Sequence, residues 1–418
     1  MAGGVRYSGS VKGGKPVTSY ADFLKSKTRY SGYDGFEPDK INPMLYDFQH
    51  DIVRWCLRKA RSAVFADCGL GKTPIQLEWA DQVKQYTSGN VLILAPLAVS
   101  MQTKREGSKF GIEVNICKTS EDLKPGINIT NYERLHYFSP NDFSGIVLDE
   151  SSILKGFDGV LRKKITDFAS SLKFRLACTA TPSPNDLIEL TNHSEFLGGL
   201  RGKEIIAMFF IQDGNTTHAW RLRKHAIEDF WRWVASWAVA LRSPSDLGYD
   251  GSGFALPALH VQDLVVPNTE PLDVYLFYMP ASTLGERLAA RRQSMSDRVQ
   301  IVADLVNESK EPWLIWCDLN KEGDSLETAI PGSVQIAGSD DVSFKEQSLM
   351  GFSNRDFRVL ISKPSIAGHG MNWQHCNNVA FVGLSDSYES YYQAVRRCWR
   401  YGQIREVNCY VVTSEAEG

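Results

Sequence analysis

The sequence predicts an α/β fold of two domains, each a parallel sheet flanked by helices, with a helical insertion after the first domain. Short apolar runs of strand length alternate with longer amphipathic stretches over residues 62–178 and again over residues 313–412. Such alternation is typical of parallel sheets wrapped by helices. It stops between about residues 196 and 253. A chain of 418 residues is too long for one compact core and long enough for two.

Four regions are expected along the chain. They are an N-terminal extension (1–44), a first α/β domain (45–198), a tryptophan-rich helical insertion (199–255) and a second α/β domain (256–418). The expected strands are residues 62–66, 91–95, 127–130, 145–148 and 174–178 in the first domain, and 313–317, 358–362, 379–383 and 407–412 in the second. In the insertion, apolar side chains at helical spacing indicate a helix packed against its neighbours: Ile227, Phe230, Val234, Trp237 and Leu241.

Composition excludes several classes of protein. Hydrophobic residues make up 43% of the chain and charged residues 23%, as is ordinary for a globular protein. The most apolar stretch, residues 230–241, is about a dozen residues long, whereas a bilayer needs roughly twenty. Residues 1–15 lack the apolar segment of a secretory signal. Eight scattered cysteines without a CxxC pair indicate reduced thiols. We expect a cytoplasmic protein with no membrane partner.

The most informative segment is residues 66–73, Ala-Asp-Cys-Gly-Leu-Gly-Lys-Thr, which lies between an apolar run and a helix-like stretch. A glycine-rich turn at such a place lets backbone N–H groups point at phosphate oxygens. Gly69 and Gly71 would permit that turn. Lys72 would add a charge at the β and γ oxygens, and the Thr73 hydroxyl would bind Mg²⁺. The loop predicts binding of a nucleoside triphosphate; the alternative is an ordinary strand-to-helix turn.

A second candidate element is the apolar strand 145–148, which is followed by Asp149 and Glu150. The ends of strands in parallel sheets are where ligand chemistry is presented. A carboxylate there can reach the Mg²⁺ held by Thr73, and its neighbour can polarise a water molecule for attack on the γ-phosphate. Taken alone, an apolar strand ending in two acids is more often the start of a solvated loop.

A third element is the segment 393–403, which contains Arg397 and Arg400. We expect it to be helical, so that two arginines three positions apart share one face. Two guanidinium groups on one face could stabilise the charge on a transferring phosphoryl group. The alternative is a surface helix whose arginines pair with nearby carboxylates.

Together these segments resemble the motifs of helicase superfamily two, and within it the Swi/Snf-type translocases of double-stranded DNA. The resemblance covers residues 45–403, in the family's order. Its elements are the glutamine motif at 45–49, the ADxGLGKT loop at 66–73, two nucleic-acid motifs at 95–97 and 129–133, a DEAH-like motif at 149–155, a TGTP-like motif at 179–182, a glycine-rich motif at 367–372 and a QAxxRxxRxGQ-like motif at 393–403.

The resemblance implies two RecA-like domains, hydrolysis of ATP with Mg²⁺, and roles for individual residues. Lys72, Glu150, Arg397 and Arg400 would be catalytic, and Thr73 and Asp149 would hold the metal. The nucleotide would be bound by Gln49, Gly69, Leu70, Gly71, Lys72, Thr73, Asp149, Gly370 and Gln393. Nucleic acid would be contacted by Pro96, Thr130, Asn131, Thr179, Thr181 and Asn372. Ser152, Ala180 and Ser365 depart from the family's usual His, Gly and Arg.

The resemblance also implies DNA as the partner, double-stranded or branched, with RNA less favoured. The net charge of −3 gives no global basic signal, so phosphate contacts must come from local basic runs such as residues 162–164. Two alternatives to a duplex translocase stay open. One is a strand-separating helicase, and the other is a nucleotide-dependent switch or recruitment module that does not move. The compact chain suggests a phage or bacterial setting.

Overall fold

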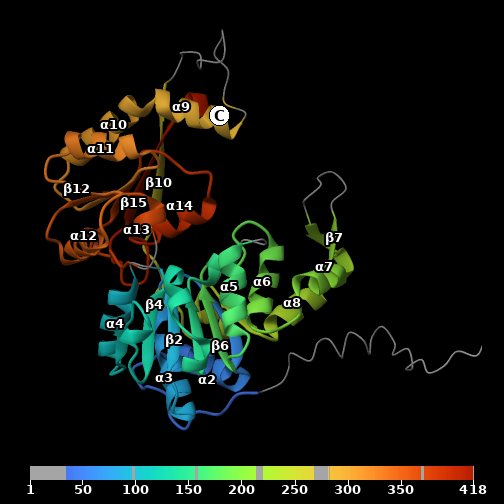
Figure 1. Cartoon of the computed structure of the whole chain (residues 1–418). Helices are drawn as coiled ribbons and strands as arrows, with labels where there is room; N and C mark the ends of the chain where they lie inside the picture. Colours follow the sequence, from blue (N-terminus) through green and yellow to red (C-terminus); the bar gives the residue numbers. More distant parts are fainter. Residues whose placement is uncertain are drawn as a thin grey trace, which may run out of the picture.

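The computed structural model describes residues 34–417 apart from 97–98, 156–158, 213–219, 268–280, 282 and 369–370. Two lobes, each built on a parallel sheet, lie one above the other (Figure 1). The predicted fold class is therefore confirmed. Within the described ranges, no helix has both the length and the apolar character needed to cross a bilayer.

The first lobe is a seven-stranded sheet in the order β3-β4-β2-β5-β6-β1-β9, with every neighbouring pair parallel. Its strands are β1 (Arg61–Ala66), β2 (Val91–Ala95), β3 (Val114–Ile116), β4 (Ile127–Asn131), β5 (Gly145–Asp149), β6 (Phe174–Thr179) and β9 (Ala238–Leu241). The helices around it are α2 (Asp47–Lys59), α3 (Lys72–Thr87), α4 (Ser100–Lys109), α5 (Val160–Ala169) and α6 (Leu190–Phe196). All five predicted strands are present.

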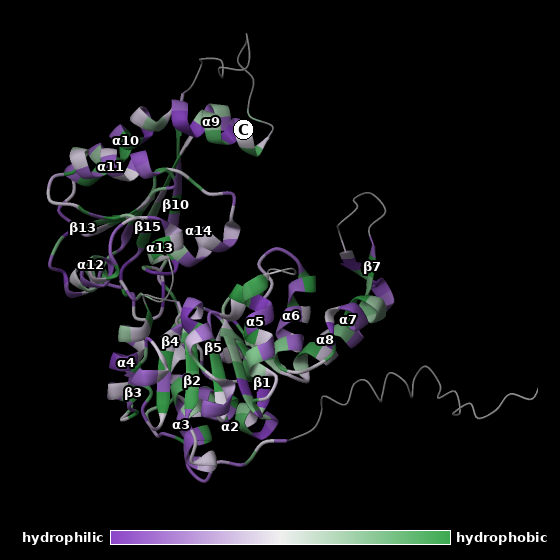
Figure 2. Ribbon diagram, viewed as in Figure 1, coloured by the Kyte–Doolittle hydropathy of each residue, from purple (hydrophilic) through white to green (hydrophobic). Residues whose placement is uncertain are grey.

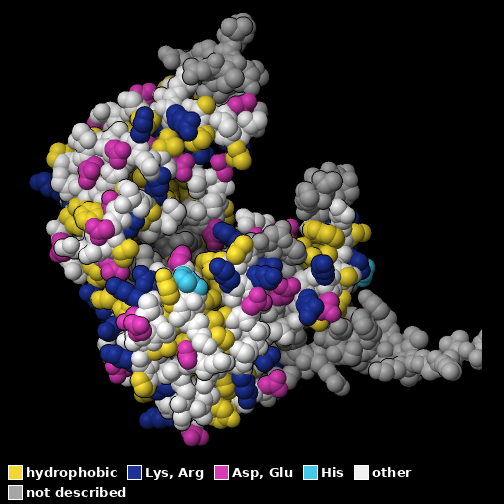
Figure 3. Space-filling model, in the orientation of Figure 1, with side chains coloured by type: hydrophobic (Ala, Val, Ile, Leu, Met, Phe, Trp, Pro, Cys, Tyr) yellow, Lys and Arg dark blue, Asp and Glu magenta, His cyan; other side chains and the backbone are white. Residues whose placement is uncertain are grey.

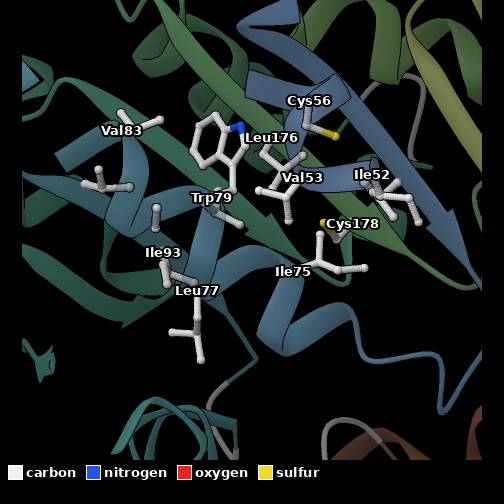
Figure 4. Packing of buried hydrophobic residues seen from close by; sticks show 14 of the residues in the cluster. Ile52, Val53, Cys56, Ile75, Leu77, Trp79, Val83, Ile93, Leu176 and Cys178 are labelled. Carbon is white, nitrogen blue, oxygen red and sulfur yellow. The ribbon is translucent and has the colours of Figure 1, made fainter. Parts of the chain in front are cut away.

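The core of the first lobe lies between the sheet and helices α2 and α3. Trp79 of α3 is fully buried there, beside Val53 and Cys56 of α2 and Leu176 of β6 (Figure 4). The strands carry mostly hydrophobic residues, whereas the helices carry both hydrophobic and hydrophilic ones (Figure 2). This division buries the sheet on both faces, as parallel sheets require.

The second lobe is a six-stranded parallel sheet in the order β10-β15-β14-β11-β13-β12. Its strands are β10 (Leu259–Val266), β11 (Trp313–Trp316), β12 (Val334–Ile336), β13 (Val359–Ser362), β14 (Asn378–Phe381) and β15 (Val407–Ser414). Its helices are α9 (Leu284–Gln293), α10 (Met295–Asn307), α11 (Asn320–Ala329), α12 (Val342–Asn354), α13 (Pro364–Ala367) and α14 (Tyr388–Val395). The four predicted strands are present; β10 and β12 were not predicted.

The insertion is only partly as expected. It contains α7 (Gly202–Phe209), an antiparallel hairpin of β7 (Phe210–Gln212) and β8 (Trp220–Leu222), and α8 (Ile227–Ala235), which project from the side of the first lobe (Figure 1). The helix predicted through Leu241 was wrong in its second half. The chain leaves the helix at Ala235 and pairs with β1 as strand β9, because that pairing satisfies the backbone of an otherwise open sheet edge. Burial of Phe230, Val234 and Trp237 in the core is confirmed, as is that of Leu241. The prediction was wrong for Ile227, the first residue of α8, whose side chain is 44% exposed.

Candidate functional site

The loop between β1 and α3 has the backbone that its glycines predict. Gly69 has φ +93° and Gly71 has φ +76°, a region that residues with a side chain rarely adopt. Space is short as well, because a Cβ on Gly69 would lie 2.7 Å from the backbone nitrogen of Tyr401 in the second lobe. The loop is therefore a tight strand-to-helix turn on which the second lobe rests directly.

Lys72 begins α3 and turns back over this loop. Its Nζ donates to the carbonyl oxygens of Ala66, at 2.9 Å, and Asp67, at 3.4 Å. No carboxylate of the described residues lies within ion-pair distance of it. Its charge is thus held in place by dipoles alone and stays available to an anion.

Asp149 is the last residue of β5, Glu150 follows it, and both are buried. Gln76 of α3 donates a 2.8 Å hydrogen bond to Asp149, and Thr179 at the end of β6 donates one of 3.4 Å to Glu150. Burial and the neighbouring Glu150 raise the pKa of Asp149 to about 6. Glu150 has φ +56°, a conformation that costs energy for a residue with a side chain and recurs at functional sites. Both acids are held in place by neighbouring strands and α3.

Arg397 and Arg400 do not lie on a helix, so that prediction was wrong. Helix α14 ends at Val395, and both arginines lie in the turn that follows it. The backbone N–H of Arg397 bonds to the carbonyl oxygen of Ala394, three residues back, so the α-helical pattern is lost there, and the Arg397 Nε donates to the carbonyl oxygen of Gln393. Both guanidinium groups also donate to the Met371 carbonyl oxygen, at 3.3 and 3.2 Å. Burial and the charge of Arg397 lower the pKa of Arg400 to about 10, so it stays charged at neutral pH.

These groups meet in one space between the lobes, which we call the interlobe cavity. Its volume is about 380 Å³. Its polar lining includes, from the first lobe, Gln49, Gly69, Gly71, Lys72, Thr73, Glu106, Lys109, Asp149 and Glu150, and from the second, Asn372, Gln374, Arg397, Arg400 and Tyr401. Of its four cationic side chains, Lys109 is paired with Glu106 at 2.7 Å, whereas Lys72, Arg397 and Arg400 have no carboxylate within ion-pair distance in the described part of the chain. The Nε of Arg400 and the Oδ1 of Asn372 are buried there without a protein partner. Such a cavity can accept a polyanion that has hydrogen-bonding groups.

Some predicted nucleotide residues have structural contacts instead. Leu70 is buried in the core and only its carbonyl oxygen is used, accepting from Gln49 at 3.0 Å. Gln49 in turn accepts from the backbone N–H of Tyr46, so its amide links the phosphate loop to the start of α2. Gln393 is buried and accepts from Arg397. Gly370 lies outside the described residues.

The residues present fit a magnesium ion. Mg²⁺ prefers oxygen ligands and is usually held by one or two protein groups together with water and substrate phosphates. The Thr73 hydroxyl and the Asp149 carboxylate both line the cavity beside the loop. This donor set suits Mg²⁺ and lacks the nitrogen and sulfur atoms typical of zinc sites.

A second space, the interlobe groove, has a volume of about 550 Å³. It is lined by Pro96, Tyr132, Glu133, Glu150, Ser152, Ile153, Lys155, Gly338, Lys345, Glu346, Leu349, Ser365, Ile366, Glu389 and Ser390. Like the cavity, the groove carries charges of both signs, but its cations are lysines and none is an arginine. Glu150 borders both spaces and is therefore the shared wall between them.

The residues predicted to contact nucleic acid do not lie together. Pro96 lines the groove, whereas Asn372 lines the cavity on the opposite side of Glu150. Thr179 is fully buried and donates to Glu150, so in this arrangement it contacts the acid and not the surface. Thr181 donates to Glu389 of α14 at 3.1 Å. Two further members of the set, Thr130 and Asn131, are buried, and Asn131 accepts a hydrogen bond from the Arg134 backbone.

Sequence reasoning missed an aromatic cluster at the mouth of the cavity. Phe254 stacks on Tyr401 with a centroid distance of 4.7 Å, and the hydroxyl groups of Tyr46 and Tyr401 are 2.7 Å apart. The three rings come from the first lobe, the connecting segment and the second lobe. The only signal in the sequence was Tyr46, an aromatic residue three positions before Gln49. Of this motif, only Gln49 was predicted to bind the nucleotide.

Comparison with known proteins bears on the second lobe. Residues 297–402 match the family model of the helicase conserved C-terminal domain. No curated protein matches the chain. Among solved structures the chain is similar to the SWI2/SNF2 ATPase core of Sulfolobus solfataricus in complex with double-stranded DNA, with 17% identity over 91% of this chain and 90% of that one and a TM-score of 0.45. The family match includes Arg397 and Arg400, and it confirms the predicted resemblance to helicases for these residues.

Proposed function

We propose that this chain, whose second lobe carries a helicase conserved C-terminal domain, is a Swi/Snf-type motor that hydrolyses ATP and moves along duplex DNA. The observation that carries the proposal is the interlobe cavity, where Lys72, Arg397 and Arg400 have no carboxylate partner of their own among the described residues. A triphosphate supplies the negative charge that these three cations lack.

The chemistry assigned to each residue follows from its position. Lys72 and the backbone of the phosphate loop would bind the phosphates, and Thr73 and Asp149 would hold Mg²⁺. The bound metal would neutralise charge on the phosphate oxygens. Glu150, held by Thr179, would orient and polarise the attacking water molecule. Arg397 and Arg400 would stabilise the charge on the phosphoryl group in the transition state.

Coupling to DNA would pass through Glu150. This residue contacts Thr179, whose hydroxyl accepts from the backbone of Thr181, and Thr181 contacts Glu389 in the second lobe. The chain of contacts leads from the cavity to the groove within three residues. Hydrolysis that shifts Glu150 would therefore change the relative position of the two lobes at the groove.

The DNA phosphates would be held by exposed basic residues along the rim between the lobes. Lys163 and Lys164 of α5 are exposed, and Lys345 of the second lobe lines the groove. Figure 3 shows Lys and Arg side chains, mixed with acids, on the surface that faces the hollow beneath the second lobe. Contacts of this kind give affinity without sequence preference.

The test is the rate of ATP hydrolysis without nucleic acid and with single-stranded DNA, duplex DNA, branched DNA and RNA. We expect duplex or branched DNA to raise kcat by about tenfold or more, a change within the range of gating by lobe closure. Displacement of the third strand from a triplex, without separation of the duplex, would complete the case for a translocase. Strand separation would favour the helicase alternative, and a rate indifferent to every nucleic acid would favour the switch.

A further inference from the structure

Helix α14 of the second lobe is fastened to the first lobe near both of its ends. At its start, Glu389 is buried and accepts from Lys155 at 2.5 Å and from Thr181 at 3.1 Å. At its end, Arg396 forms an ion pair with Asp67 of the phosphate loop. The helix therefore cannot shift along its axis or tilt without breaking buried polar contacts at one end or the other.

Arg396 is held rigidly by its own lobe. Its guanidinium lies against the rings of Tyr392, at 5.4 Å, and Trp399, at 4.8 Å from the ring centroids. It also donates to the Tyr392 hydroxyl at 3.3 Å and to the Trp399 carbonyl oxygen at 3.4 Å. Only 4% of its side chain is exposed. Stacking and hydrogen bonds of this kind fix a planar guanidinium better than they would fix a lysine.

Asp67 presents both carboxylate oxygens to this group. One oxygen accepts from the Arg396 guanidinium, and the other accepts from the Tyr392 hydroxyl and from the backbone N–H of Cys68. Burial opposes the charge on Arg396, yet the carboxylate of Asp67 prevails and raises the pKa of Arg396 above its ordinary value. A side chain of the phosphate loop is thus bound by two side chains of the other lobe.

The neighbouring arginine has the opposite environment. Arg397 directly follows Arg396, faces the interlobe cavity and has only carbonyl and amide oxygens as partners in the described chain. The Arg396 guanidinium has a carboxylate partner, the Arg397 guanidinium has none among the described residues, and the two residues are adjacent in the chain. The contact of Arg396 with the loop therefore determines how far Arg397 and Arg400 reach toward Lys72.

We propose that the ion pair between Asp67 and Arg396, supported by Tyr392, positions the two cavity arginines over the phosphate loop, so that Arg396 is a positioning residue and does not touch the nucleotide. The inference rests on the proposed function, because it assigns these residues to ATP hydrolysis. A misplacement of about 1 Å can cost a reaction about 10²-fold.

The test compares Arg396→Gln, Arg396→Lys, Asp67→Asn and the double variant Asp67→Asn/Arg396→Gln in the full chain. We expect Arg396→Gln to lower kcat by about 10- to 100-fold with the KM for ATP changed by less than about twofold. Arg396→Lys should recover little, because it lacks the planar fork. The kcat of the double variant should lie no more than about threefold below that of Arg396→Gln, since the two residues act as one unit. The matched control is Arg232→Gln, which removes an exposed ion pair within one lobe.

Turnover of Arg396→Gln within twofold of the parent, or losses that multiply in the double variant, would overturn the positioning role. If Arg396→Gln does not fold, Tyr392→Phe serves in its place, because it removes one donor to Asp67 and keeps the ring. A fall of about three- to tenfold in kcat is expected for that variant. No change in kcat would count against the proposal.

A second measurement separates this inference from the proposed function. All eight native cysteines are buried, so dyes can be placed on Glu113→Cys and Glu308→Cys, two exposed positions in different lobes. We expect Arg396→Gln to shift the interlobe distance to longer values or broaden its distribution, with Arg232→Gln unchanged. If the parent protein does not hydrolyse ATP but Arg396→Gln still shifts the interlobe distance, the proposed function is contradicted, whereas the role of the contact in holding the lobes together is supported. An unchanged distribution would refute the contact's role in holding the lobes together.

Discussion

The two walls of the interlobe cavity differ in charge. The first lobe supplies the carboxylates Asp149 and Glu150, the free cation Lys72, and an ion pair between Lys109 and Glu106. The second lobe supplies Arg397 and Arg400 and no carboxylate among the described lining residues. The first wall can hold a metal and activate water, and the second can only stabilise negative charge. Neither wall is a complete site by itself. Any reaction in the cavity therefore depends on the distance between the lobes.

The comparison also explains why the second wall can tolerate two buried arginines side by side. Each donates to the Met371 carbonyl oxygen, and a bound polyanion would supply the remaining partner. Without one, burial lowers the pKa of Arg400, and repulsion by Arg397 lowers it further. The arrangement stores an electrostatic cost that ligand binding relieves.

Removing the phosphate-loop cation of the first wall should have the largest effect. Lys72→Ala should lower ATP turnover by about 10³-fold or more, because the other lysine of that wall, Lys109, is already paired with Glu106. Duplex DNA binding should stay within about twofold, as Lys72 does not line the groove. Steady-state hydrolysis and a filter-binding assay check both, with Lys173→Ala, an exposed lysine of the same lobe that lines neither space, as the control. Retained turnover in folded Lys72→Ala would remove the basis for the proposed reaction.

Removing one cation of the second wall should have a smaller effect of a different kind. Arg400→Ala should lower kcat by about 10²-fold while ATP binding weakens by less than about fivefold, since the charge it stabilises is greatest in the transition state. Arg292→Ala, an exposed arginine of the second lobe, is the matched control. Equal losses in binding and in kcat would mean that this wall binds the ground state as strongly as the transition state.

A pH series should separate the two walls further. Asp149 has its pKa raised from 3.8 to about 6, so it takes up a proton as the pH falls through 6 and then competes with Mg²⁺. The apparent Mg²⁺ affinity should weaken by about tenfold between pH 7 and pH 5. A phosphate group also titrates near pH 6, so Asp149→Asn supplies the baseline. Identical pH dependence in the parent and this variant would remove Asp149 from the metal site.

Much of this site could be read from the sequence because its parts are local. The spacing of glycines and Lys72 in one loop, and of two acids after one strand, specifies strand-to-loop geometry without reference to the rest of the chain. The predictions failed where distant residues decide. Arg397 lies beyond its helix in a turn whose guanidinium groups bond to Met371, and Leu241 leaves its helix because β1 offers a free edge. The pairing of Asp67 with Arg396 joins residues 329 positions apart, which no local pattern reveals.

The smallest expected effect concerns stability. Because the pKa of Asp149 is higher in the folded chain than its ordinary value of 3.8, the group favours folding only while protonated, and that contribution is lost as the pH rises through about 6. At pH 7.5 the buried carboxylate beside Glu150 therefore costs on the order of 2 kcal/mol. Asp149→Asn keeps the acceptor for Gln76 and should melt about 3–6 °C higher than the parent at pH 7.5 without nucleotide. Asp142→Asn, an exposed acid of the same lobe, should melt within about 1 °C of the parent. The gain should vanish near pH 4, where the carboxyl is protonated in the folded chain, and a gain that is equal at both pH values would show that packing and not charge is responsible.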